Sequence, residues 1–152
     1  ADFFRKSLSY GAKETIPLSE ELSLLHHYLD IEKIRFGKRL TVQLTIDSET
    51  VTDLVPPLIL QPLVENAIKH GIADSLDGGT ITITTQKKNG RLFITVENPV
   101  ESDAPKKKGA GMGMEIVRQR LQTVYGNNGD LKTVVNGNRH HVILFLPTSQ
   151  RT

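Results

Sequence analysis

The sequence of 152 residues contains no cysteine and no tryptophan, and aromatic residues make up only 5% of it. The lack of cysteine excludes disulfides and thiolate metal sites, and a reducing compartment suits such a chain. The net charge is only +2, and no basic stripe alternates with aromatic residues, so nucleic acid is not an expected partner. No apolar run approaches the roughly 18 residues of a membrane span, and no signal peptide is visible. Because the chain does not start with methionine, we interpret it as a piece of a longer protein.

Composition and periodicity predict one compact domain. Hydrophobic residues make up 38% and charged residues 24% of the chain, which is ordinary for a globular protein. Ser19 and Gly37 mark the start and end of a helix, and strict apolar alternation predicts a strand over 40–46 with one buried face. The later expected elements are a helix over 57–70, strands 80–86 and 91–97, a loop over 98–112, a helix over 113–124, and strands 130–135 and 141–146. One sheet covered by helices on one face is the economical packing.

The helix expected over 57–70 has two distinct faces. At about 100° per residue, one side is entirely apolar and the other carries a carboxylate, an amide, an ammonium and an imidazole. The apolar residues are Leu60, Leu63, Val64, Ala67 and Ile68, and the polar residues are Glu65, Asn66, Lys69 and His70. The polar set could hold a hydrated Mg²⁺ and attached phosphates. A solvated face is the more ordinary interpretation of this helix alone, although Asn66 is only a middling helix former.

A glycine-rich segment precedes the helix expected over 113–124. It reads Gly109-Ala110-Gly111-Met112-Gly113, and three lysines, 106–108, come just before it. Residues without side chains let backbone N–H groups approach an anion, and the helix N-terminus adds its positive end. The segment therefore predicts a phosphate cradle, with a flexible surface loop as the alternative. It is not a Walker loop, and its spacing fits a dinucleotide fingerprint poorly.

These two motifs, in this order, resemble the ATPase domain that histidine kinases share with DNA gyrase and MutL. Residues 60–71, LQPLVENAIKHG, resemble its N box, and residues 109–114, GAGMGM, resemble its second glycine box. The likeness narrows to sensor kinases of the LytS and AlgZ type. Three further segments resemble this type of kinase, namely PLSEEL at 17–22, YLDIEKIRF at 28–36 and VRQRL at 117–121. The resemblance covers roughly residues 15–147.

The resemblance implies a fold, a site and its ligands. The implied fold is an α/β (α+β) two-layer sandwich of the GHKL (Bergerat) type, with a mixed β-sheet covered by helices on one face. Asn66 would bind Mg²⁺ bridging the ATP phosphates, and Glu65 would help with proton transfer or metal hydration. The residues that would also bind ATP are Lys69, His70 and Asn98, with Gly109, Gly111, Gly113 and Met114 of the ATP lid. Residues 1–15 would be the end of an upstream dimerisation helix or linker, and residues 16–152 the ATP-binding catalytic domain.

The sequence departs from the family pattern in three places. Asn98 stands where the family's adenine-reading Asp is expected, and Glu97 would take that place if the strand register were shifted by one residue. A Gly-Thr pair near the last strand is missing. His140 and His141 stand close to that place, and we interpret them as strand residues at a hairpin end. No histidine is followed by Phe, as the family's phosphoacceptor is, so we interpret His26 and His27 as structural or surface residues.

We therefore expect the catalytic domain of a two-component sensor histidine kinase. It would bind Mg·ATP and donate the γ-phosphate to a histidine on a dimerisation helix outside this chain. Expected partners are ATP, the upstream dimerisation and phosphoacceptor domain in a full-length homodimer, and a response regulator, with the LytTR type as a candidate. The resemblance also implies a cytoplasmic domain of a bacterial protein anchored in the inner membrane. A nucleotide-binding module without productive phosphotransfer and an interaction domain without nucleotide are the alternatives.

Overall fold

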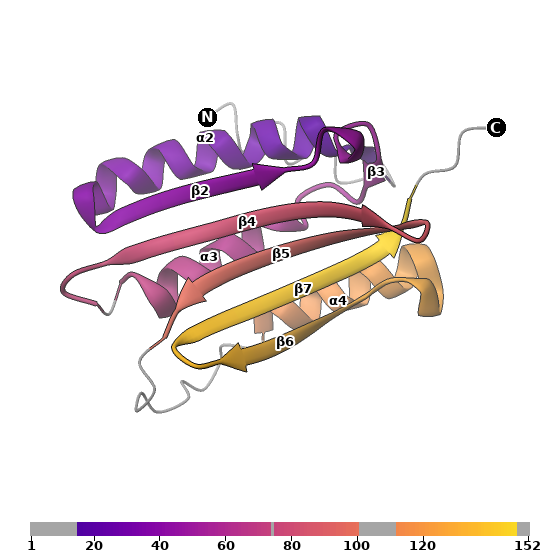
Figure 1. The fold of residues 1–152 in the computed structure, drawn as a ribbon. Helices are drawn as coiled ribbons and strands as arrows, with labels where there is room; N and C mark the ends of the chain where they lie inside the picture. The colour runs from indigo at the N-terminus through magenta and orange to yellow at the C-terminus, as the bar shows by residue number, and fades with distance from the viewer. Residues whose placement is uncertain (1–14, 74, 101–111, 149–152) are drawn as a thin grey trace.

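The computed structural model describes residues 15–73, 75–100 and 112–148 as a mixed sheet with helices on one face (Figure 1). The sheet has the strand order β2-β4-β5-β7-β6, with β2 parallel to β4 and the other neighbours antiparallel. Its strands are β2 (Leu40–Ile46), β4 (Gly79–Lys88), β5 (Arg91–Pro99), β6 (Asp130–Asn136) and β7 (Arg139–Pro147). Its helices are α2 (Leu18–Phe36), α3 (Leu60–Gly71) and α4 (Met112–Tyr125). The expected two-layer α/β sandwich is confirmed.

The hydrophobic core lies between the helices and the central strands. Alternate residues of β5, from Leu92 to Val96, are fully buried, and so are Leu144 and Leu146 on β7. The apolar residues of α3 cover this face, as its two-faced sequence predicts. Burying one such side chain stabilises the fold by about 1.5–3 kcal/mol, so the register of β5 is strongly fixed. The same alternation brings Asn98, at the end of β5, onto the helix-covered face.

Several expected boundaries were wrong. The second helix begins at Leu60 and not at residue 57, because Leu58 has a positive φ of 61° that a helix cannot continue. Residues 98 and 99 do not belong to a loop, since Asn98 and Pro99 pair with His140 and Arg139 of β7. This cross-strand pairing cannot be read from local propensity, and it extends both strands by two residues.

The strand over 40–46 forms as expected, but its predicted buried face is incomplete. Leu40 is buried, whereas Leu44 is 48% exposed. The strand lies at the edge of the sheet, and its strand neighbour is β4 alone. Alternation predicts which residues share a face, but the position in the sheet decides how fully that face is covered.

A small second sheet was not expected from the sequence. Strand β1 (Ile16–Pro17) pairs antiparallel with β3 (Leu54–Val55), and this pairing brings the start of α2 beside the segment that leads into α3. Two-residue strands are too short to produce a periodic pattern. Residues 1–14 lie outside the described part of the chain, so the division at residue 15 stays a prediction. No helix among the described residues is both long and apolar enough to cross a membrane.

Candidate functional site

The predicted polar face of α3 exists in the structure. Glu65 and Lys69 are exposed, while Asn66 and His70 are partly buried. The opposite side of the helix is packed into the core, which holds the helix in one orientation. The four polar side chains therefore project from a fixed backbone, as a site that positions phosphates and a metal would need.

The end of the glycine-rich segment lies against this helix. A Cβ added to Gly113, in the first turn of α4, would be 3.9 Å from the Cβ of Pro62 on α3. Met114 is partly buried and packs against the hydrophobic core. Gly109 and Gly111 lie outside the described residues. For Gly113 and Met114, the structure thus brings the second motif beside the first.

Asn98 also lies against α3, at the opposite end of that helix. It is only 1% exposed, and a Cβ on Gly71 would be 2.9 Å from both its Cβ and its Nδ2. Side chains larger than hydrogen therefore do not fit at Gly71 without a shift. The Nδ2 of Asn98 donates a hydrogen bond to the carbonyl oxygen of Pro99 at 2.9 Å, and its Oδ1 lies 3.4 Å from Nδ1 of His140.

Glu97 belongs to the other face of the sheet. Its carboxylate accepts a hydrogen bond from Nε of Arg139 at 2.7 Å and lies 3.9 Å from Nε2 of His141. The pairing with β7 thus places Asn98 on the helix-covered face and Glu97 on the opposite face. Which of the two would contact a base stays a prediction.

Three histidines surround this end of the sheet. Burial lowers the pKa of His140, and the nearby His141 and His70 lower it further. The ring of His140 is consequently neutral at neutral pH. The expectation that His140 and His141 are strand residues at a hairpin end is confirmed, but it missed the contact of His140 with Asn98. His26 is exposed and pairs with Asp30 at 3.5 Å, and His27 is exposed too, so both are surface residues.

Glu21 is a positioning residue that sequence reasoning missed. It lies in the first turn of α2, where the local sequence alone would assign its charge only to that helix's own dipole. Instead it is 2% exposed, and its carboxylate accepts hydrogen bonds from the backbone N–H groups of Leu58, Ile59 and Leu60 at 2.8, 2.8 and 3.2 Å. Burial raises its pKa, while these three bonds and the charge of Arg120 lower it. Glu21 thus caps the start of α3 from a helix about 37 residues away in sequence.

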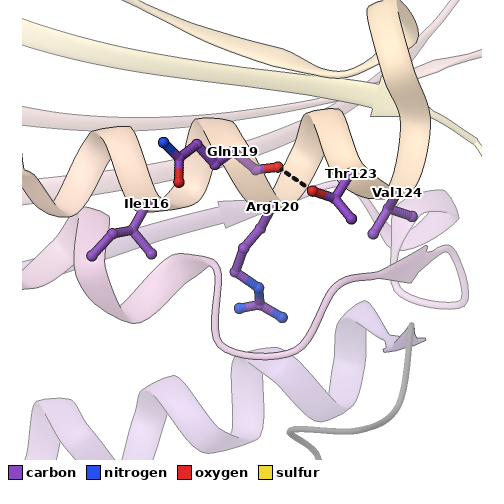
Figure 2. Close-up of a pocket in the computed structure, with 5 residues that line it drawn as sticks. All are labelled: Ile116, Gln119, Arg120, Thr123 and Val124. Carbon is purple, nitrogen blue, oxygen red and sulfur yellow. Dashed lines mark hydrogen bonds between the residues drawn. The ribbon is translucent and has the colours of Figure 1, made fainter.

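Arg120 on α4 is near enough to Glu21 for the two charges to influence each other. Figure 2 shows its side chain reaching from α4 toward the segment that connects β3 to α3. It borders a surface pocket of about 270 Å³ lined by Ile116, Gln119, Arg120, Thr123 and Val124. A second pocket of about 400 Å³ lies at the β4–β5 hairpin, lined by Lys88, Asn89, Arg91 and Phe93. Neither pocket contains a residue of the predicted site.

Most of the chain is similar in sequence to sensor histidine kinases. The sensor histidine kinase BtsS of Escherichia coli (strain K12) is 36% identical over 126 residues, which cover 83% of this chain and 22% of BtsS. The sensor protein LytS of Staphylococcus haemolyticus is 32% identical over 143 residues, covering 86% of this chain and 24% of LytS. A family model described as histidine kinase matches residues 1–40. The chain belongs to the LytS-type sensor histidine kinases.

The fold comparison extends this assignment to the architecture of the domain. The crystallised catalytic domain of the histidine kinase ThkA superimposes with a TM-score of 0.69 over 90% of this chain and 97% of ThkA's domain, at 20% identity. The expected GHKL-type architecture is thereby confirmed for this LytS-type chain. The chain spans only about a quarter of the length of the sensor kinases named above. It therefore corresponds to one part of such a kinase.

Proposed function

We propose that this chain is the ATP-binding catalytic domain of its sensor kinase, and that it binds Mg·ATP and donates the γ-phosphate to a histidine outside this chain. The observation that carries the proposal is the meeting of three motifs around one helix. Gly113 lies at the first turn of α3, Asn98 lies at its last turn, and the polar face lies between them. A nucleotide could contact all three with its phosphates and base.

The residues present fit Mg²⁺ and phosphates by their chemistry. Mg²⁺ prefers oxygen ligands, keeps several waters and takes only one or two protein ligands beside the phosphates. Asn66 supplies a partly buried amide oxygen, and Glu65 supplies an exposed carboxylate next to it. Lys69 places a positive charge one turn further along the same face, where it would attract phosphate oxygens. The bound nucleotide supplies the transferable phosphoryl group, and the contribution of these residues is positioning and charge neutralisation.

Asn98 is the residue that would face the adenine. Its side-chain oxygen can accept a hydrogen bond from the 6-amino group, but without the charge of a carboxylate. We therefore expect this domain to bind ATP weakly. Weak ATP binding would favour a second candidate function, a nucleotide-binding module without productive phosphotransfer. The partners that we propose are the dimerisation domain of the same protein and a response regulator on the cytoplasmic side of the membrane.

Two measurements test the proposal. Calorimetry with Mg·ATP should show saturable binding to this chain, and no binding at millimolar nucleotide would refute the assignment. The chain joined to its own upstream helices should then form phosphohistidine from ATP labelled at the γ-phosphate. Binding without phosphohistidine, in a dimer that is folded, would support the second candidate instead.

A further inference from the structure

We infer that His140 determines base specificity by fixing the side-chain amide of Asn98, so that the domain accepts 6-aminopurine and rejects 6-oxopurine nucleotides. The inference rests on the proposed function, in which the base lies at Asn98. Its starting point is a cross-strand pair. Asn98 on β5 and His140 on β7 are direct partners in the sheet, and both side chains lie on the face covered by helices.

An asparagine side chain by itself cannot distinguish these two bases. Its oxygen accepts a hydrogen bond from a 6-amino group, and after a 180° rotation its NH₂ donates equally well to a 6-oxo group. An aspartate has no such ambiguity, because both of its oxygens are acceptors. A protein that reads adenine with asparagine therefore needs a neighbour that fixes the rotation of the amide.

The surroundings of Asn98 supply this neighbour. Its NH₂ donates to the carbonyl oxygen of Pro99 at 2.9 Å, and its oxygen lies 3.4 Å from Nδ1 of His140. In the tautomer with the hydrogen on Nδ1, His140 donates to the amide oxygen, and the carbonyl oxygen of Pro99, which can only accept, orients the NH₂. A rotated amide would place its NH₂ against this N–H and its oxygen against the Pro99 carbonyl. Both attractive contacts would become repulsive.

Close packing around Asn98 also restricts the rotation of its side-chain amide. Asn98 is 1% exposed, and α3 approaches it so closely that even a Cβ at Gly71 would be 2.9 Å from its Nδ2. The oxygen of Asn98 has two lone pairs, so it can accept from His140 and from a 6-amino group at the same time. His140 does not have to contact the base to select it.

The test compares the affinities of this chain for Mg·ATP and Mg·ITP, whose bases carry a 6-amino and a 6-oxo group. The first decisive variant is His140→Leu, which removes the donor. His140→Asp places an acceptor there and should rotate the Asn98 amide. The matched control is His141→Leu, because His141 lies on the other face beside Glu97.

We expect the wild-type chain to prefer ATP. The preference should fall about fivefold or more in His140→Leu, the equivalent of one net hydrogen bond. It should reverse toward ITP in His140→Asp and remain unchanged in His141→Leu. Thermal unfolding checks that each variant is folded, and His140→Asp decides the matter if His140→Leu does not fold.

Three outcomes would overturn the inference. Equal losses for both nucleotides would show that His140 only supports the fold, and unchanged affinities in His140→Leu and His140→Asp would show that it does not act on Asn98. If the wild-type chain binds neither nucleotide, the proposed function itself fails. That result differs from a wild-type chain that binds ATP but whose preference ignores His140.

Discussion

The buried carboxylate of Glu21 should be one of the most sensitive positions for the stability of this domain. Replacing Glu21 by alanine leaves the backbone N–H groups of Leu58, Ile59 and Leu60 without their acceptor. It also removes a negative charge that lies near the half-buried Arg120. The start of α3 would no longer be capped by a residue of α2. The polar side chains of α3 would then be held less firmly in place.

The loss of unfolding free energy in Glu21→Ala is the difference between two opposing contributions. A buried donor left without a partner costs about 1–3 kcal/mol, and two of these three bonds are buried while that of Leu58 is partly buried, so the gross cost is several kcal/mol. Burial raises the pKa of Glu21, so removing the carboxylate also removes a desolvation penalty and returns part of this cost. We expect Glu21→Ala to lower the free energy of unfolding by about 3 kcal/mol, and the isosteric Glu21→Gln, which keeps one acceptor oxygen, by about 1 kcal/mol.

Urea unfolding at pH 7 measures this difference, with Glu20→Ala as the matched control one residue earlier in α2. Amide hydrogen exchange adds a local assay, since exchange at residues 58–60 should accelerate more than exchange in the sheet. A loss below about 0.5 kcal/mol in Glu21→Ala, the range of ordinary surface substitutions, would refute the reasoning. So would a loss in Glu20→Ala equal to that in Glu21→Ala.

Four further predictions concern the site. Asn66→Ala should weaken Mg·ATP binding far more than binding of metal-free ATP, and calorimetry showing equal losses would remove Asn66 from the metal site. Asn98→Asp should lower the free energy of unfolding by about 1–3 kcal/mol, because its second carboxylate oxygen would face the Pro99 carbonyl oxygen to which Nδ2 of Asn98 now donates at 2.9 Å, and unchanged urea unfolding would contradict this. Gly71→Ala should lower the free energy of unfolding by about 1–3 kcal/mol, because its Cβ meets Asn98 at 2.9 Å, and the control Gly113→Ala, whose Cβ would lie at an ordinary 3.9 Å from Pro62, should not. Burial lowers the folded-state pKa of His140, so its contribution to stability is present above pH 6.5 and is lost as pH falls through the folded pKa. Urea unfolding across pH 5–7.5 should show this loss in the wild-type chain, and an equally steep loss in His140→Asn would refute it.

The sequence by itself determined the parts of this protein that depend on neighbouring residues. The period of Leu60, Leu63 and Val64 predicted the buried side of α3, and the N box marked the polar side that carries Asn66. The alternation along β5 likewise determined that Asn98 and Glu97 lie on opposite faces. Local spacing is enough for these inferences because a helix and a strand repeat every 3.6 and every 2 residues. The family resemblance then supplied the roles expected of these positions.

Only the tertiary structure decided which of these residues meet. Glu21 reaches the start of α3 across 37–39 positions, and Asn98 meets His140 across 42. Such contacts depend on the order of strands in the sheet and on how the helices pack over it, and neither leaves a periodic signal in the chain. Local patterns could therefore show that Glu21 suits a helix start and that His140 ends a hairpin. They could not show that Glu21 caps a different helix or that His140 faces Asn98, because both partners are brought close only when the core is assembled.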